Sequence, residues 1–380
     1  MTASGVIVVT CEYEPFPGGI GTYATRLVAE VRAAGHQALV VAPAYPEMGE
    51  AADAEALRLF GHHRISPFAF PGLLSALRGA PRDWPVLAAD IRSVIAMSVL
   101  KPLHGRAYMA MVHGSEVSKL AARSPASLIA RRAYRGAEAI CANSRSTLTD
   151  FEAALPDAPT GRVTWLGVET DWFEPAAGPF DSQMLAAIAP DATIVCAVGR
   201  LEARKGHADV IRALAGRTDT VFVAAGRAES DAYVDELHDV ARAANLRLVL
   251  PGAVSRSDLK RLYARSACHV LAAKDLPGRK EGLGLVLLEA AAQGCPSVAT
   301  GAGGVPEAMG DTGIMTPQGD VSALASAIRT YVEDPVRRRA DGEVARKRAR
   351  RFTWRACAMA TFPTLAWDEP AASVTVDGGV

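Results

Sequence analysis

The sequence of 380 residues lacks long apolar runs and an excess of either charge. No segment reaches the roughly 18 consecutive apolar residues that a membrane-spanning helix needs. The first apolar run, residues 5–10, has no basic stretch before it and is too short for a signal-peptide core. Lysine and arginine together number 41, as do aspartate and glutamate, whereas a dedicated nucleic-acid binder carries a basic excess. We therefore expect a cytoplasmic protein that binds no nucleic acid.

Cysteine is scarce, and no C-x-x-C pair occurs. Most of the cysteines lie in short apolar runs that are typical of strands. Single cysteines of this kind indicate small buried hydrophobic residues in a reducing compartment rather than a disulfide framework. The six are Cys11, Cys141, Cys196, Cys268, Cys295 and Cys357.

The dinucleotide fingerprint G-x-G-x-x-G is missing from the first glycine-rich turn. The apolar, β-branched run Val6–Thr10 predicts a buried parallel strand, and Thr22–Ala34 has helical periodicity. The turn between them contains Gly18-Gly19-Ile20-Gly21, which lets the backbone approach a phosphate. This order is typical of a Rossmann-like unit, but the missing fingerprint argues against an NAD-dependent oxidoreductase.

The composition fits two globular domains. Apolar residues make up 49% of the chain and charged residues 22%, and 380 residues are too many for most single cores. The strand-turn-helix pattern restarts at Ile194–Val198 and continues as alternating strands and helices. We therefore predict an α/β protein with two Rossmann-like domains.

The most informative stretch is a glycine-punctuated loop that opens an apolar helix. Free N–H groups at the start of such a helix form an anion site, here from Gly282 through Leu283 and Gly284 to Leu285. Glu281 precedes the helix, and Glu289 lies eight residues further on, about two helical turns from Glu281, so both carboxylates can face a ligand at the helix start. A carboxylate in the apolar run after Leu283 must be partnered or costs several kcal/mol. One phosphate cradle and two acceptors suit a sugar nucleotide.

Two further positions follow strands at the edge where open α/β sheets bind ligands. Arg200 and Lys205 stand at a strand end and a helix start, a placement that is unfavourable unless an anion lies there. His113, beside Gly114 and followed by Glu116, lies at the end of the predicted strand 107–112. Taken alone, each is equally compatible with a structural role.

Glu281 and Glu289 are separated by seven residues and followed by G-C-P-S-V-A-T and G-G-V-P-E. This run of some thirty residues resembles the signature of the retaining glycosyltransferases of family 4, which have the GT-B fold. That fold implies two Rossmann-like domains that face a cleft and a C-terminal helix that crosses back to the first. The resemblance implies that Glu281 holds hydroxyls of the donor sugar and that Glu289 holds the ribose hydroxyls of the nucleotide.

The same resemblance implies roles for other residues. G-R-L-x-x-x-K-G makes Arg200 and Lys205 the diphosphate clamp, together with the loop before the apolar helix and Gly19. His113 would contact the donor sugar near the reacting carbon. The acceptor side is assigned to Gly18, Gly19 and Glu116, and the nucleobase border to Ala253 and Val254.

The expected activity is metal-independent transfer of a sugar from a nucleoside-diphosphate sugar, GDP-mannose or UDP-hexose, to a hydroxyl of a sugar, lipid-linked or natural-product acceptor. We expect no cofactor and no metal, because the Asp-x-Asp string of metal-dependent transferases is absent. Retention of configuration comes from the resemblance alone. A phosphorylase or epimerase of the same fold, or a non-catalytic nucleotide-sugar-binding protein, stays open.

The predicted domains are 1–175, an acceptor domain, and 176–352, a donor domain. Residues 353–367 would form the crossing helix and 368–380 a loose tail. We also expect a loop over 58–70, a helix over 86–100 and one basic amphipathic helix over 119–135. The last could lie on an anionic membrane or form a solvated face.

Overall fold

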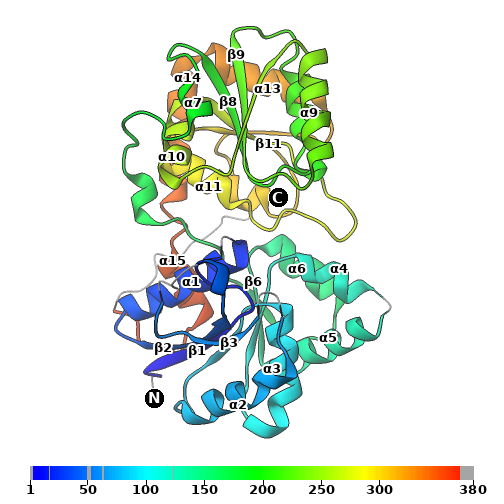
Figure 1. The fold of residues 1–380 in the computed structure, drawn as a ribbon, viewed down its shortest axis with the longest axis vertical. Coiled ribbons are helices and arrows are strands. Elements are labelled where there is room, and N and C mark those ends of the chain that lie inside the picture. The colour runs from blue at the N-terminus through cyan, green and yellow to red at the C-terminus, as the bar shows by residue number, and fades with distance from the viewer. Residues whose placement is uncertain (1–2, 17, 49–52, 62–63, 123, 369–380) are drawn as a thin grey trace. The chain divides into compact units, whose positions relative to one another are not determined.

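The computed structural model describes residues 3–16, 18–48, 53–61, 64–122 and 124–368. The chain divides into two compact units, and each contains one parallel sheet with helices packed against it (Figure 1). The first comprises residues 1–167, 277–282 and 353–380, and the second 168–276 and 283–352. The prediction of two Rossmann-like domains is confirmed.

The first unit has a seven-stranded sheet in the order β3-β2-β1-β4-β5-β6-β7. All five residues of β1 are buried, as the unbroken apolar run predicted, and they pair in parallel register with Gln37–Val41 of β2. The strands are β1 (Gly5–Val9), β2 (Gln37–Pro43), β3 (Leu57–Phe60), β4 (Val86–Ala88), β5 (Met109–Val112), β6 (Ala139–Ala142) and β7 (Gly161–Val163).

The helices of the first unit cover this sheet, and the last of them packs against the first. They are α1 (Gly19–Ala33), α2 (Phe70–Gly79), α3 (Ile91–His104), α4 (Ser115–Ala121), α5 (Pro125–Arg135), α6 (Arg145–Ala154) and α15 (Trp354–Thr361). Short 3₁₀ turns occupy Pro46–Met48 and Pro67–Ala69. The helix after residue 352 therefore belongs to the first unit.

The second unit has a six-stranded parallel sheet in the order β10-β9-β8-β11-β12-β13. Its strands are β8 (Thr193–Val198), β9 (Thr220–Ala225), β10 (Arg247–Gly252), β11 (Ser266–Leu271), β12 (Ser297–Thr300) and β13 (Ile314–Thr316). Its helices are α7 (Gln183–Ala186), α8 (His207–Ala213), α9 (Asp231–Ala243), α10 (Arg256–Arg265), α11 (Leu285–Ala292), α12 (Val305–Met309), α13 (Val321–Glu333) and α14 (Pro335–Ala349). Two 3₁₀ turns, η3 (Thr170–Phe173) and η4 (Ala203–Lys205), complete it.

Three predicted elements were wrong. Residues 58–70 are not a loop, because β3 occupies most of their first third and α2 begins at Phe70. Residues 86–100 are not one helix: β4 comes first, and the Asp90 side chain then caps α3 by accepting from two backbone N–H groups. Residues 119–135 form the end of α4 and all of α5, because Ser124 caps a new helix with Pro125 in its first turn.

The prediction that the cysteines are small buried residues without a disulfide is confirmed, since all six are buried and unpaired. The division between units falls after Gly167 rather than after residue 175. The segment that follows packs within the second unit, where the Gln293 side chain donates to the carbonyls of Trp172 and Glu174. The predicted tail, 368–380, lies outside the described residues except for Asp368.

Candidate functional site

In the second unit, the predicted anion site lies at the start of α11. The capping residue Gly284 has a φ of 80°, and no side chain caps the helix. Leu287 donates its backbone N–H to the Gly284 carbonyl at 2.9 Å, and the N–H groups before it, those of Leu285 and Val286, can meet a ligand. The helix buries Leu287, Leu288 and its alanines and packs against α14 and α10. The apolar pattern of the sequence thus fixes the helix, and its uncapped end follows from Gly284.

Glu289 lies on α11 in largely protein surroundings, although it keeps some accessible surface. Burial raises the pKa of Glu289 to about 7, and the nearby Glu169 carboxylate adds to this rise. The Arg256 guanidinium and the Tyr263 hydroxyl oppose it. The free protein therefore holds Glu289 close to its titration point at neutral pH.

Arg256, on the first turn of α10, binds the turn η3 and acts electrostatically on Glu289. Its guanidinium contacts Glu169 at 3.1 Å and Asp171 at 2.6 Å, and it lies 4.8 Å from the centre of the Trp172 ring. A cation shared by two carboxylates and stacked on an indole has little freedom to move. Arg256 thus supplies fixed positive charge next to the Glu169 and Glu289 carboxylates.

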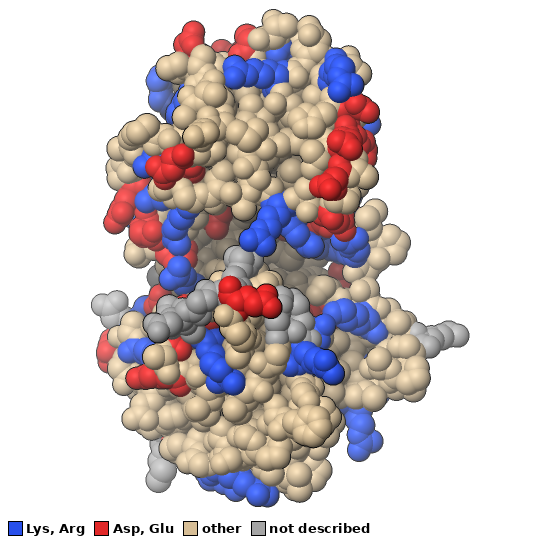
Figure 2. Space-filling view, viewed as in Figure 1, with Lys and Arg blue, Asp and Glu red and all other residues tan. Residues whose placement is uncertain are grey.

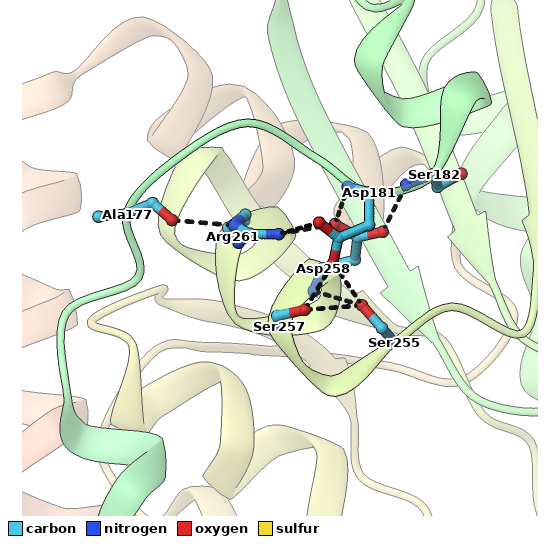
Figure 3. A network of polar contacts seen from close by, with 7 residues as sticks. All are labelled: Ala177, Asp181, Ser182, Ser255, Ser257, Asp258 and Arg261. Carbon is cyan, nitrogen blue, oxygen red and sulfur yellow. Dashed lines mark hydrogen bonds and ion pairs between the residues drawn. The ribbon is translucent and has the colours of Figure 1, made fainter.

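A second polar network holds α10 in place (Figure 3). The buried Asp258 carboxylate accepts from the backbone N–H groups of Asp181 and Ser182, both at 2.8 Å. Arg261 contacts Asp258 and Asp181, both at 3.2 Å, and donates to the Ala177 carbonyl at 3.0 Å. The network fastens residues 177–182 to the helix that carries Arg256.

The turn between β8 and α8 carries Arg200 and Lys205. Glu202, buried at 1% exposure, lies between them in sequence, and its carboxylate binds Arg204 at 2.9 Å and Arg200 at 3.7 Å. Part of the positive charge that seemed to require a bound anion is therefore met by the chain itself. The Arg200 side chain is 68% exposed, so it can still reach a ligand.

In the first unit, four contacts fix His113 at the end of β5. The Glu116 carboxylate accepts from its backbone N–H at 3.0 Å, and the Asn143 amide donates to its carbonyl at 3.1 Å. The ring nitrogen Nε2 lies 2.9 Å from the Ala89 carbonyl oxygen. The Tyr23 ring stands at 79° to the imidazole, with centroids 5.1 Å apart. Glu116 is buried, and its carboxylate holds this turn.

The loop with Glu281 packs within the first unit. Lys280 forms an ion pair with Asp150 at 2.9 Å. A Cβ on Gly282 would crowd the Asn143 amide and the His113 carbonyl, so only glycine allows this approach. Glu281 helps to line a hollow of about 160 Å³, together with Gly114, Val117, Ser146, Thr147, Asp150, Gly278 and Lys280.

The predicted site residues thus fall into two groups. The first unit carries His113, Glu116, Glu281, Gly282, Gly18 and Gly19, the last two at the start of α1. The second unit carries Arg200, Lys205, Leu283, Gly284, Leu285, Glu289, Ala253 and Val254, the last two directly after β10. In both units these groups follow the carboxyl ends of parallel strands.

Several residues that shape these groups were not predicted, namely Asp90, Asn143, Glu169, Glu202, Arg256 and Tyr263. Glu202 could have been noticed, because it lies within the same motif as Arg200. The partnership of Arg256 with Glu169 spans distant segments and leaves no local pattern.

On the face that Figure 2 shows, basic and acidic side chains occur on both units. Among the described residues no three His, Cys, Asp or Glu side chains are grouped to hold a metal ion. In that part of the chain no helix is long and apolar enough to cross a bilayer.

Two family models match the chain. Residues 17–172 match Glycosyltransferase Family 4, and residues 186–348 match Glycosyl transferases group 1. The D-inositol 3-phosphate glycosyltransferase of Kineococcus radiotolerans is 30% identical over 68% of this chain, which spans 64% of that relative. The GDP-mannose-dependent alpha-(1-6)-phosphatidylinositol monomannoside mannosyltransferase of Mycolicibacterium smegmatis is 27% identical over 90% of this chain and 92% of its own.

Solved structures share the fold. Sucrose-phosphate synthase from Thermosynechococcus elongatus has a TM-score of 0.76 at 21% identity, covering 93% of this chain and 96% of its own. Anabaena HepE in complex with UDP-glucose has a TM-score of 0.74 at 20% identity, covering 94% and 98%. Both matched families and this fold lead to one conclusion: the chain belongs to the glycosyltransferases of family 4 and group 1, with the GT-B fold.

Proposed function

We propose that the protein transfers a hexose from a nucleoside-diphosphate sugar to a hydroxyl group, with retention of configuration and without a metal ion. One observation carries this proposal: an uncapped helix start and a carboxylate about one turn later, Glu289, lie on the same helix of a Rossmann-like unit. The helix start suits a phosphate, and the carboxylate suits the ribose hydroxyls.

The residues divide the chemistry in the following way. Arg200, Lys205 and the first turn of α11 stabilise the negative charge that develops on the leaving diphosphate. Glu289 accepts from the ribose hydroxyls, and Glu281 accepts from hydroxyls of the donor sugar. His113 contacts that sugar near the reacting carbon, and no side chain is assigned as a covalent nucleophile. Ala253 and Val254 border the base.

GDP-mannose and UDP-hexose are the donors we propose, with a sugar, lipid-linked or natural-product hydroxyl as acceptor. The name of the mycobacterial relative specifies GDP-mannose, and the Anabaena structure contains UDP-glucose. The six buried, unpaired cysteines support a cytoplasmic location.

The direct test is to incubate the protein with GDP-mannose or UDP-glucose and follow release of the free nucleoside diphosphate, with and without candidate acceptors. We expect release from one donor and stimulation by an acceptor. An epimerase would instead change the sugar without releasing the nucleotide, and a phosphorylase would need inorganic phosphate. A binding protein would raise its melting temperature with the donor but release nothing.

We also propose that α4 and α5 touch an anionic membrane. Leu128 and Ile129 are 69% and 51% exposed beside the exposed Arg132. The predicted basic face is reduced, because Arg131 donates to backbone carbonyls and Arg135 pairs with Asp157. Arg123 lies outside the described residues.

Cosedimentation with vesicles tests this contact. The wild type should sediment with vesicles that contain anionic lipid. A Leu128→Ser, Ile129→Ser variant should lose most of this binding. Equal sedimentation of both proteins, or none with anionic vesicles, would remove α5 as a membrane contact.

A further inference from the structure

The orientation of the His113 ring is determined by an acceptor. A backbone carbonyl oxygen can only accept, so the 2.9 Å contact with Ala89 requires the hydrogen on Nε2. In the neutral imidazole, Nδ1 then has a lone pair and no hydrogen. Among the described residues no hydrogen bond to Nδ1 is present, and the residue is partly exposed. The ring therefore presents an acceptor, not a donor, to whatever it meets.

The Ala89 carbonyl is itself held by the junction of three elements. Ala89 follows β4, and its N–H donates to the Val9 carbonyl of β1 at 2.9 Å. The next residue, Asp90, is 3% exposed and caps α3. Ala89 is thus fixed between a strand pairing on one side and a buried carboxylate on the other.

Four donors satisfy the Asp90 carboxylate. Oδ1 accepts from the backbone N–H groups of Arg92 at 2.9 Å and Ser93 at 3.1 Å. Oδ2 accepts from the backbone N–H of Cys11 at 2.6 Å and the Ser93 hydroxyl at 2.7 Å. In an asparagine at this position, the amide oxygen could take the place of Oδ1 at the cap. The NH₂ group would then take the place of Oδ2, where it could not accept from Cys11 and Ser93. The need for two acceptor oxygens explains an aspartate rather than an asparagine.

We propose that Asp90 is a positioning residue that, through the Ala89 carbonyl, fixes His113 as the Nε2–H tautomer, so that Nδ1 accepts a hydrogen bond from a hydroxyl of the donor sugar. The proposal about the sugar rests on the proposed function, whereas the tautomer does not. It assigns His113 to a hydroxyl rather than to the anionic diphosphate. The Tyr23 ring supports the same orientation from the side.

Nitrogen-15 NMR of the histidine side chains tests the tautomer without any activity. The wild type should show His113 protonated on Nε2 only, with assignment from the His113→Gln spectrum. Asp90→Asn keeps the cap and should broaden this signal or mix the tautomers, and Ser93→Ala should do so to a smaller extent. Asp334→Asn is the matched control, because Asp334 caps α14 through two similar bonds and lies outside the site. A proton on Nδ1 in the wild type, or an unchanged signal in both Asp90→Asn and Ser93→Ala, would overturn the proposal.

Two replacements of His113 test which nitrogen meets the sugar. The amide of Asn occupies the place of Nδ1, and that of Gln occupies the place of Nε2. His113→Asn should retain about tenfold more nucleoside-diphosphate release than His113→Gln, and Asp90→Asn should lower release by about tenfold or more. Equal or reversed activities would overturn the assignment of Nδ1. If the wild type releases no nucleoside diphosphate from any donor, the proposed function fails, while the NMR signal still decides the tautomer.

Discussion

At the scale of single residues, Glu289 is subject to two opposing demands. Its surroundings raise its pKa to about 7, yet accepting from two ribose hydroxyls requires the ionised form. Because the folded protein raises this pKa, the contribution of protonated Glu289 to stability is complete below the ordinary carboxyl pKa and is lost as pH rises through about 7. Nucleotide binding should then release a proton near pH 7.

We predict that affinity for the nucleoside diphosphate rises by up to about tenfold per pH unit between about pH 5 and 7 and levels off above. Calorimetry in buffers of different ionisation enthalpy would measure both the affinity and the released proton. Glu289→Gln should bind the nucleotide more weakly, and its affinity should not change with pH. Relative to the wild type, the variant should gain about 1 to 3 kcal/mol of unfolding free energy between pH 5 and pH 8, because it lacks the carboxyl group whose pKa is raised. The same slope in wild type and variant would show that another group titrates.

Arg200 contributes little to the stability of the fold, because its side chain is mostly exposed. We predict that Arg200→Ala keeps the melting temperature and loses about 2 to 4 kcal/mol of transition-state stabilisation, as does Lys205→Ala, measured from kcat/KM. Arg242→Ala is the matched control, since Arg242 is an exposed arginine paired with Asp239 on α9. Losses below tenfold in both clamp variants would mean that the diphosphate is bound elsewhere.

At the scale of elements, the turn before α8 depends on close packing of Gly206. Its φ is 73°, and a Cβ there would overlap the Ala272 carbonyl. Gly206→Ala should therefore cost about 2 to 4 kcal/mol of unfolding free energy, measured by urea denaturation. Gly216→Ala is the control, because Gly216 has a φ of 77° with open space around it and should cost about 1 kcal/mol. Equal losses would show that φ alone sets the requirement.

The elements that the sequence predicted are those with a long or uniform pattern. β1, α1 and α11 each have several consecutive turns or an unbroken apolar run. β4 has only three residues, too few to show a strand periodicity, so the sequence prediction merged it with the helical pattern of α3. The break at Ser124-Pro125 was readable as a cap followed by proline, but the basic residues on both sides suggested continuity.

Partners of the site residues were harder to predict than the residues themselves. The E-x₇-E spacing identified Glu281 and Glu289 because it is local. The contacts that set the charge of Glu289 come from a 3₁₀ turn and another helix, namely Glu169 and Arg256. Such contacts depend on tertiary packing, so spacing along the chain does not encode them.

At the scale of the whole molecule, the chain alternates between two units, and the candidate groups divide with it. Residues 277–282 belong to the first unit and Leu283 onward to the second, so Glu281 and Glu289 are carried by different units. We predict full activity after EDTA treatment, because Arg200, Lys205 and the α11 helix start meet the diphosphate charge. Loss of activity in EDTA that Mg²⁺ or Mn²⁺ restores would contradict this prediction.

We propose that the second unit binds a nucleoside diphosphate through Glu289, while Glu281 accepts from hydroxyls of the donor sugar. The most direct measurement is calorimetric titration of UDP, GDP, ADP and dTDP, each without sugar, into wild type, Glu289→Ala and Glu281→Ala. We predict that one nucleotide binds the wild type and Glu281→Ala with nearly equal affinity and binds Glu289→Ala at least about tenfold more weakly. Absence of binding by all four nucleotides, or equal losses in the two variants, would contradict this division of roles between Glu289 and Glu281.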